Sequence, residues 1–124
     1  MEESGDGKMS TNSSDIELVN DGVNQTIGLR FTGLNIPHGA SIDSAFIQFT
    51  VDEVSTGACL LSIRGDDADN SQPFSSVSKS VSDRVTTSAE VTWEPAEWPT
   101  VGAAGADQET PDLSSIIQEI VNRP

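Results

Sequence analysis

The stretch Leu29–Glu53, LRFTGLNIPHGASIDSAFIQFTVDE, carries the clearest structural signal in the chain. Apolar and polar residues alternate at both of its ends, at Leu29 and Phe31 and again at Ala45, Ile47, Phe49 and Val51. This period of two is typical of strands that bury one face. A polar connector with two glycines and a proline separates the runs. The stretch therefore predicts two strands joined by a structured crossover, the second of them at 42–51.

The rest of the chain continues this pattern. Further alternating runs predict strands at 15–19, 26–32, 58–64 and 89–93, with a turn at Asn20-Asp21-Gly22. A length of 124 residues suits one domain with one core. Aromatic residues make up only 5% of the chain and polar turn residues are plentiful, which favours an all-β sandwich.

The two ends of the chain differ from its middle. Residues 1–14 are acidic, rich in Gly, Ser and Thr and without hydrophobic periodicity, so we expect a flexible tail or linker before a β-sandwich domain at 15–124. Near the other end Thr110 is a candidate cap and Pro111 a candidate first residue of a short helix. Its apolar face consists of Leu113, Ile116, Ile117, Ile120 and Val121. A helix this short requires docking on the sandwich for stability.

Charge limits the partners. Twenty acidic and six basic residues give a formal net charge of −14. Such a surface repels phosphate backbones and anionic lipids, so nucleic acid is an unsuitable partner. No stretch is long and apolar enough to span a membrane. The first ten residues lack the pattern of a secretory signal, so we expect any export signal of the parent protein to lie outside this chain.

An acidic loop follows the strand predicted at 58–64. Asp66, Asp67, Asp69 and Asn70 supply closely spaced oxygen atoms, and Ca²⁺ prefers six to eight such ligands. The loop lacks the spacing and the distal glutamate of an EF-hand. A calcium site and a solvated acidic loop both stay open as interpretations.

Three aromatic residues are candidate ligand contacts. Trp98 lies in a loop between prolines, Phe46 faces away from the predicted core, and Phe74 lies in a Ser-rich segment. Each ring suits stacking on a sugar. The alternatives are a Trp lid over the sandwich for Trp98 and a neighbouring strand or loop that covers Phe46. For Cys59 a small core side chain is the better interpretation than a nucleophile, because the one histidine, His38, lies in a turn.

Several short motifs together carry a resemblance to a known family. They are Gly28-Leu29-Arg30-Phe31, Ile36-Pro37-x-Gly39-Ala40-x-Ile42-x-x-Ala45, Val91-Thr92-Trp93 and Thr110-Pro111-Asp112-Leu113 leading into Ile117-Gln118-Glu119-Ile120-Val121. In this order, over residues 15–124, they resemble the DNRLRE-type domains, jelly-roll β-sandwich modules of secreted, mostly bacterial proteins. The resemblance implies a jelly-roll-like sandwich with one short C-terminal helix.

The chain departs from that family in two ways. The hexapeptide that names the family is absent, and the relatives continue past the helix with further strands. We therefore expect a domain that is truncated at its C-terminal end or completed by a partner chain, because missing strands leave sheet edges uncovered.

Three classes of function follow. The resemblance implies a non-catalytic extracellular or cell-surface module that binds a carbohydrate or anchors its parent at a polysaccharide surface. The alternative is a structural or adhesion spacer among the other domains of a larger parent protein. An enzyme is the weakest hypothesis, because no constellation of basic residues, His or Tyr distinguishes any one pair of carboxylates.

Overall fold

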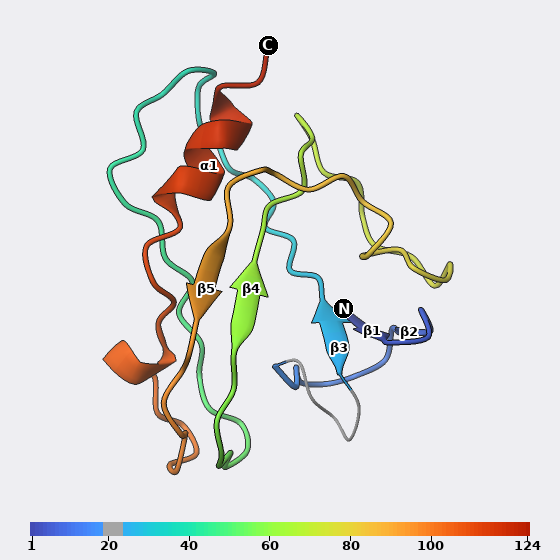
Figure 1. Ribbon diagram of the computed structural model, residues 1–124, viewed down its shortest axis with the longest axis vertical. Coiled ribbons are helices and arrows are strands. Elements are labelled where there is room, and N and C mark those ends of the chain that lie inside the picture. The colour runs from blue at the N-terminus through green and yellow to red at the C-terminus, as the bar shows by residue number, and fades with distance from the viewer. Residues whose placement is uncertain (19–23) are drawn as a thin grey trace. The chain divides into compact units, whose positions relative to one another are not determined.

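A computed structural model describes residues 1–18 and 24–124 (Figure 1). Over these residues the chain forms two small antiparallel sheets and one short α-helix. This confirms the expected β-rich class with a short C-terminal helix. The predicted turn at Asn20–Gly22 lies outside the described residues. The chain divides into two compact units, a first unit of Met1–Asn35 and Asp66–Val85 and a second unit of Ile36–Gly65 and Thr86–Pro124.

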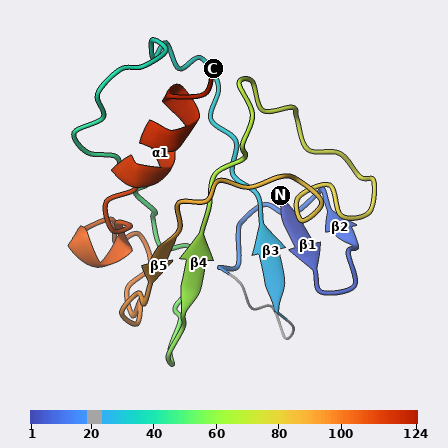
Figure 2. The same ribbon diagram turned by 45° about the horizontal axis from the view of Figure 1, so that its top comes forward.

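The first unit is built on a three-stranded antiparallel sheet. Its central strand is β1 (Glu2–Ser4), which pairs with β2 (Met9–Ser10) on one side and with β3 (Gln25–Ile27) on the other (Figure 2). A tight turn joins β1 to β2. Gly7 adopts φ +85° in this turn, a conformation that glycine tolerates better than other residues.

The interpretation of residues 1–14 as an unstructured tail is corrected by this sheet. Both β1 and β2 lie in that segment, and Glu2 and Glu3 are buried. Their carboxylates accept hydrogen bonds from backbone N–H groups elsewhere in the unit. Polar side chains with such partners can be buried. Hydrophobic periodicity does not detect strands of this kind.

Two neighbouring predictions also change. The strand expected at 15–19 is absent from its described part, where residues 15–18 are irregular. The strand expected at 26–32 is shorter, since β3 ends at Ile27 and Phe31 is 60% exposed. Gly28, the next residue, still exchanges hydrogen bonds with Met1, which precedes β1. A Cβ at Gly28 would lie 2.6 Å from Cζ of Phe74, so glycine allows this ring to pack against the backbone.

The second unit contains the other sheet. In this sheet β4 (Leu61–Ile63) pairs antiparallel with β5 (Val91–Trp93), with Ser62 opposite Thr92. Strands were expected at 58–64 and 89–93, so their positions are confirmed and their lengths are reduced. Val91 and Ile63 are half-buried and Leu61 and Trp93 are buried, so alternate residues of each strand face inward, as strands with one buried face require.

The segment expected as a strand at 42–51 contains one isolated bridge, from Gln48 to Glu109. It still runs beside the residues that lead to the helix, since Phe49 N–H donates to Gln108 O and Leu113 N–H donates to Ala45 O. The predicted alternation is confirmed. The inward residues are half-buried or buried: Ala45, Ile47, Phe49 and Val51. The outward residues are exposed: Phe46, Gln48 and Thr50.

Helix α1 (Ser114–Val121) begins later than the sequence predicts. Thr110 does not cap it, because its Oγ1 accepts a hydrogen bond from Ile47 N–H, and Pro111 precedes the helix. Asp112 takes over part of the capping, since its Oδ1 accepts a hydrogen bond from Ser114 N–H. The prediction of a buried apolar face holds best for Leu113 and Ile116.

The apolar core belongs to the second unit. Among the described residues, the buried hydrophobic side chains are Val51, Leu61, Trp93, Leu113 and Ile116. Gly65 lets the helix approach closely, because a Cβ there would lie 2.8 Å from both Ile116 Cγ2 and Ile120 Cδ1. The chain that leaves β4 thus passes directly against α1.

Replacing Gly65 with alanine tests this contact. We expect Gly65→Ala to lower the free energy of unfolding by about 1–3 kcal/mol, because overpacking forces the helix or the backbone to shift. Gly105→Ala is the matched control, since the nearest atom to its Cβ position, Gln108 Oε1, is 3.7 Å away. Chemical denaturation of both variants measures the difference. Equal stabilities would contradict the close approach of α1.

Candidate functional site

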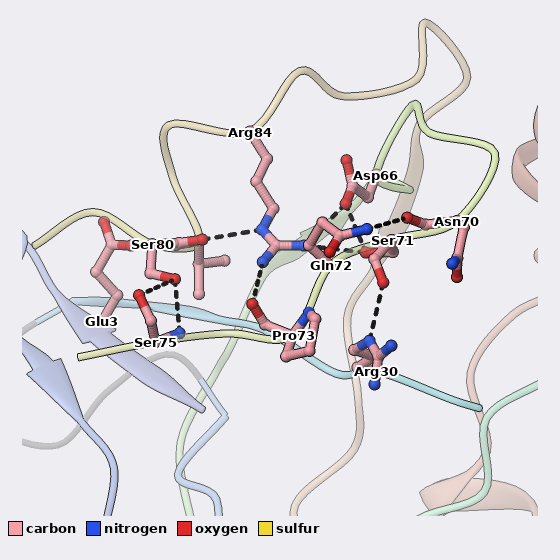
Figure 3. A network of polar contacts seen from close by, with 11 residues as sticks. Glu3, Arg30, Asp66, Asn70, Ser71, Gln72, Pro73, Ser75, Ser80 and Arg84 are labelled. Carbon is pink, nitrogen blue, oxygen red and sulfur yellow. Dashed lines mark hydrogen bonds and ion pairs between the residues drawn. The ribbon is translucent and has the colours of Figure 1, made fainter. Parts of the chain in front are cut away.

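The acidic loop of the first unit lies against an arginine that is distant in sequence (Figure 3). Arg84 Nη1 lies 2.9 Å from Asp66 Oδ2, and Ser71 Oγ donates a hydrogen bond to the same oxygen. The side chains of Arg84 and Asp66 are only 17% and 25% exposed. The first of the predicted calcium ligands therefore already has a cationic partner.

The guanidinium of Arg84 makes three further polar contacts. Its Nε donates to Ser80 O at 2.9 Å, its Nη2 to Pro73 O at 3.1 Å and its Nη1 to Ser71 Oγ at 2.9 Å. Arg30 adds a donor at the same place, with Nε 3.0 Å from Ser71 O (Figure 3). We call Asp66, Ser71, Phe74, Ser80 and Arg84 the Arg84 clamp. It ties the acidic loop to the turn before Arg84.

Phe74, a predicted ligand contact, is part of this clamp. The Cζ of Arg84 lies 4.4 Å from the centroid of the Phe74 ring, a cation–π arrangement. The ring also packs against the backbone of Gly28. Sequence analysis missed Arg84, although it is one of only six basic residues in a chain of net charge −14.

The remaining predicted calcium ligands are Asp67, Asp69 and Asn70. Asp67 N–H donates to Val85 O at 2.9 Å, and Asn70 O accepts from Gln72 Nε2. Within residues 1–18 and 24–124, no three His, Cys, Asp or Glu side chains are grouped to hold a metal ion. Calcium binding by this loop stays a prediction from its composition.

Trp98 lies in the second unit as part of an aromatic cluster. Its ring centroid is 6.2 Å from those of Phe49 and Trp93, which are themselves stacked 5.9 Å apart. Its Nε1 donates to Asp107 O at 3.0 Å. Phe46 lies on the opposite face of the 45–51 segment and is 51% exposed. Trp98 thus packs beside Phe49 on the inward face of the 45–51 segment, whereas Phe46 lies on its outward face.

Several carboxylates bind backbone N–H groups, a role that the sequence did not indicate. Glu3 Oε2 accepts from Val81 N–H and Ser82 N–H at 3.0 and 2.9 Å. Burial acts to raise the pKa of Glu3, but these hydrogen bonds outweigh it and the pKa is lowered. In the second unit Glu119 holds two consecutive N–H groups at 2.7 Å each, those of Ser88 and Ala89.

A pair of carboxyl groups, Glu2 and Glu17, lies beside β1. Glu2 Oε1 accepts a hydrogen bond from Glu17 N–H at 3.0 Å. A side-chain hydrogen bond to Glu2, together with burial and the charges of Glu2 and Asp15, raises the pKa of Glu17 to about 7. Burial opposes the shift at Glu2, but hydrogen bonds from Glu17 and Ser13 lower its pKa. Glu17 is therefore only partly ionised near pH 7.

Comparisons with protein-family models, with curated proteins and with solved structures give no significant match. The resemblance to DNRLRE-type domains therefore stays a prediction. Over the described parts of the chain, the structure contains no helix with the length and apolarity needed to cross a membrane.

The Arg84 clamp predicts unequal effects for two arginines. We expect Arg84→Ala to lower the free energy of unfolding by about 2–3 kcal/mol, because it removes several hydrogen bonds and leaves Asp66 without its cation. Arg64→Ala is the control. Its ion pair with Glu90 is 48% and 36% exposed, and exposed pairs contribute little. Urea denaturation measures both, and equal losses would contradict a structural clamp.

The Glu2–Glu17 pair predicts a pH dependence of stability. Glu17 loses its proton near the ordinary pKa of 4.5 when unfolded and near 7 when folded. Its stabilising contribution is therefore complete below pH 4.5 and declines until the pH passes about 7. The contribution of Glu2 has the opposite sign, since its pKa is lowered. It is present above 4.5 and is lost as the pH falls through the folded value.

Melting temperatures of the wild type and of Glu17→Gln, measured between about pH 5 and about pH 8, test this sign. The glutamine keeps a hydrogen-bond donor at every pH. We expect the wild type to lose stability relative to the variant as the pH rises. Parallel curves would show that the two carboxyl groups do not share a proton.

Proposed function

We propose that this chain is a non-catalytic structural module of a larger extracellular or cell-surface protein. The observation that carries the proposal is the use of its charged side chains. Arg84, Asp66, Glu3 and Glu119 all have partners within their own unit. Charged groups used in this way hold loops in a fixed conformation, and a spacer domain requires such a defined shape.

The surroundings of Cys59, the candidate nucleophile, and of His38, the candidate base, support a non-catalytic role. Burial raises the pKa of the Cys59 thiol, whereas a reactive cysteine requires a lowered pKa. His38 lies in an exposed turn of the same unit. The Asp112 carboxylate accepts hydrogen bonds from Ala45 N–H and Ser114 N–H, so the backbone holds its orientation.

A second candidate is the carbohydrate-binding or polysaccharide-anchoring module that the family resemblance implies. The observation in its favour is Phe46, a half-exposed ring flanked by the exposed polar residues Ser44 and Gln48. An aromatic face among amide and hydroxyl groups suits stacking on a sugar ring. The jelly-roll-like sandwich, calcium binding by the acidic loop and completion by further strands belong to this candidate.

Binding to polysaccharides separates the two candidates. We expect the wild-type chain to show no saturable binding on a glycan array or in affinity electrophoresis, in EDTA or in Ca²⁺, while it melts cooperatively. Saturable binding that is lost in Phe46→Ala but kept in Phe31→Ala would establish the second candidate instead. Phe31 is the matched control because it is an exposed phenylalanine of the first unit. Release of sugar fragments would overturn both candidates.

A further inference from the structure

Two segments of the first unit have the pattern of an N-glycosylation acceptor. They are Asn12-Ser13-Ser14 and Asn24-Gln25-Thr26, each with a hydroxyl residue two positions after the asparagine and no proline between. The transferase must bind the asparagine and that hydroxyl together in an accessible segment. The two segments differ in how the fold presents them.

Asn12 lies in an open segment. Residues 10–14 are all exposed, and residues 11–13 have no regular secondary structure. Ser13 Oγ donates to Asp15 O at 2.9 Å and the Ser13 side chain also interacts with Glu2, while Asn12 and Ser14 on either side of it are exposed. A segment of this kind can change its backbone conformation without breaking a strand.

Asn24 directly precedes a strand. Its partner in the motif, Thr26, is the central residue of β3 and lies opposite Glu3 on β1. Binding of this motif by a transferase would require β3 to leave the sheet. The folded unit therefore offers Asn12 and withholds Asn24.

We propose that Asn12 is an acceptor site for an N-linked oligosaccharide, an inference that rests on the extracellular location in the proposed function. The donor is a lipid-linked oligosaccharide pyrophosphate. The side-chain nitrogen of Asn12 forms a bond to the anomeric carbon, the bond from that carbon to the pyrophosphate oxygen breaks, and the amide loses one proton. The attached oligosaccharide lies two residues beyond β2, one of the two edge strands of the sheet, and shields that edge.

The test uses the folded chain, a purified eukaryotic oligosaccharyltransferase and a lipid-linked oligosaccharide, with intact mass measured before and after peptide N-glycosidase treatment. We expect one oligosaccharide on the wild type and on Asn24→Gln, and none on Asn12→Gln or Ser14→Ala. No transfer to the folded wild type, or transfer that persists in Asn12→Gln, would overturn the proposal. Because the assay involves no polysaccharide ligand, its outcome is independent of the binding test for the proposed function.

Discussion

The structure depends on hydrogen bonds from backbone N–H groups to carboxylates. Over residues 1–18 and 24–124 the regular strands are two or three residues long, so much of the extended backbone there lacks a strand partner. Buried N–H groups require an acceptor, and an ionised carboxylate is a strong one. Glu3 and Glu119 each hold two consecutive N–H groups, and they fix the turn at 81–82 and the loop at 88–89. These side chains thus supply acceptors for backbone N–H groups in a turn and a loop that lie outside the sheets.

The two units use this interaction to different degrees. In the second unit the carboxylates position loops around an apolar core, which supplies the hydrophobic contribution to stability. In the first unit the glutamates of β1, Glu2 and Glu3, are buried. The Arg84 clamp adds a cation with several hydrogen bonds. Stability in the first unit therefore relies more on satisfied polar groups. Loss of one partner there leaves the other buried and unpaired.

The periodicity of apolar residues, two in strands and about 3.6 in the helix, predicted β4, β5, the inward face of the 45–51 segment and the apolar face of α1. It failed at β1, because Glu2 and Glu3 look like tail residues until their backbone partners are known. It also misplaced the start of α1, because the hydroxyl of Thr110 binds Ile47 N–H, a contact that no local pattern contains. In the candidate site the loop at 66–70 was found from composition. Its partner Arg84 was not, because 18 positions separate Asp66 from Arg84.

Part of the strong negative charge of the chain comes from carboxylates that bind backbone N–H groups, and composition alone does not show this. Glu119 offers one oxygen to Ser88 N–H and the other to Ala89 N–H. A glutamine would turn an NH₂ group toward one of these donors, so the neutral analogue cannot replace the carboxylate. Asp112 differs, because its Oδ1 accepts both N–H groups and its Oδ2 accepts only from the hydroxyl of Ser114, which an amide NH₂ could contact instead. The backbone therefore requires an acidic residue at position 119, whatever the charge of any partner. The net charge therefore reflects in part how this chain satisfies its own amides, and it is weaker evidence about ligands than its magnitude suggests.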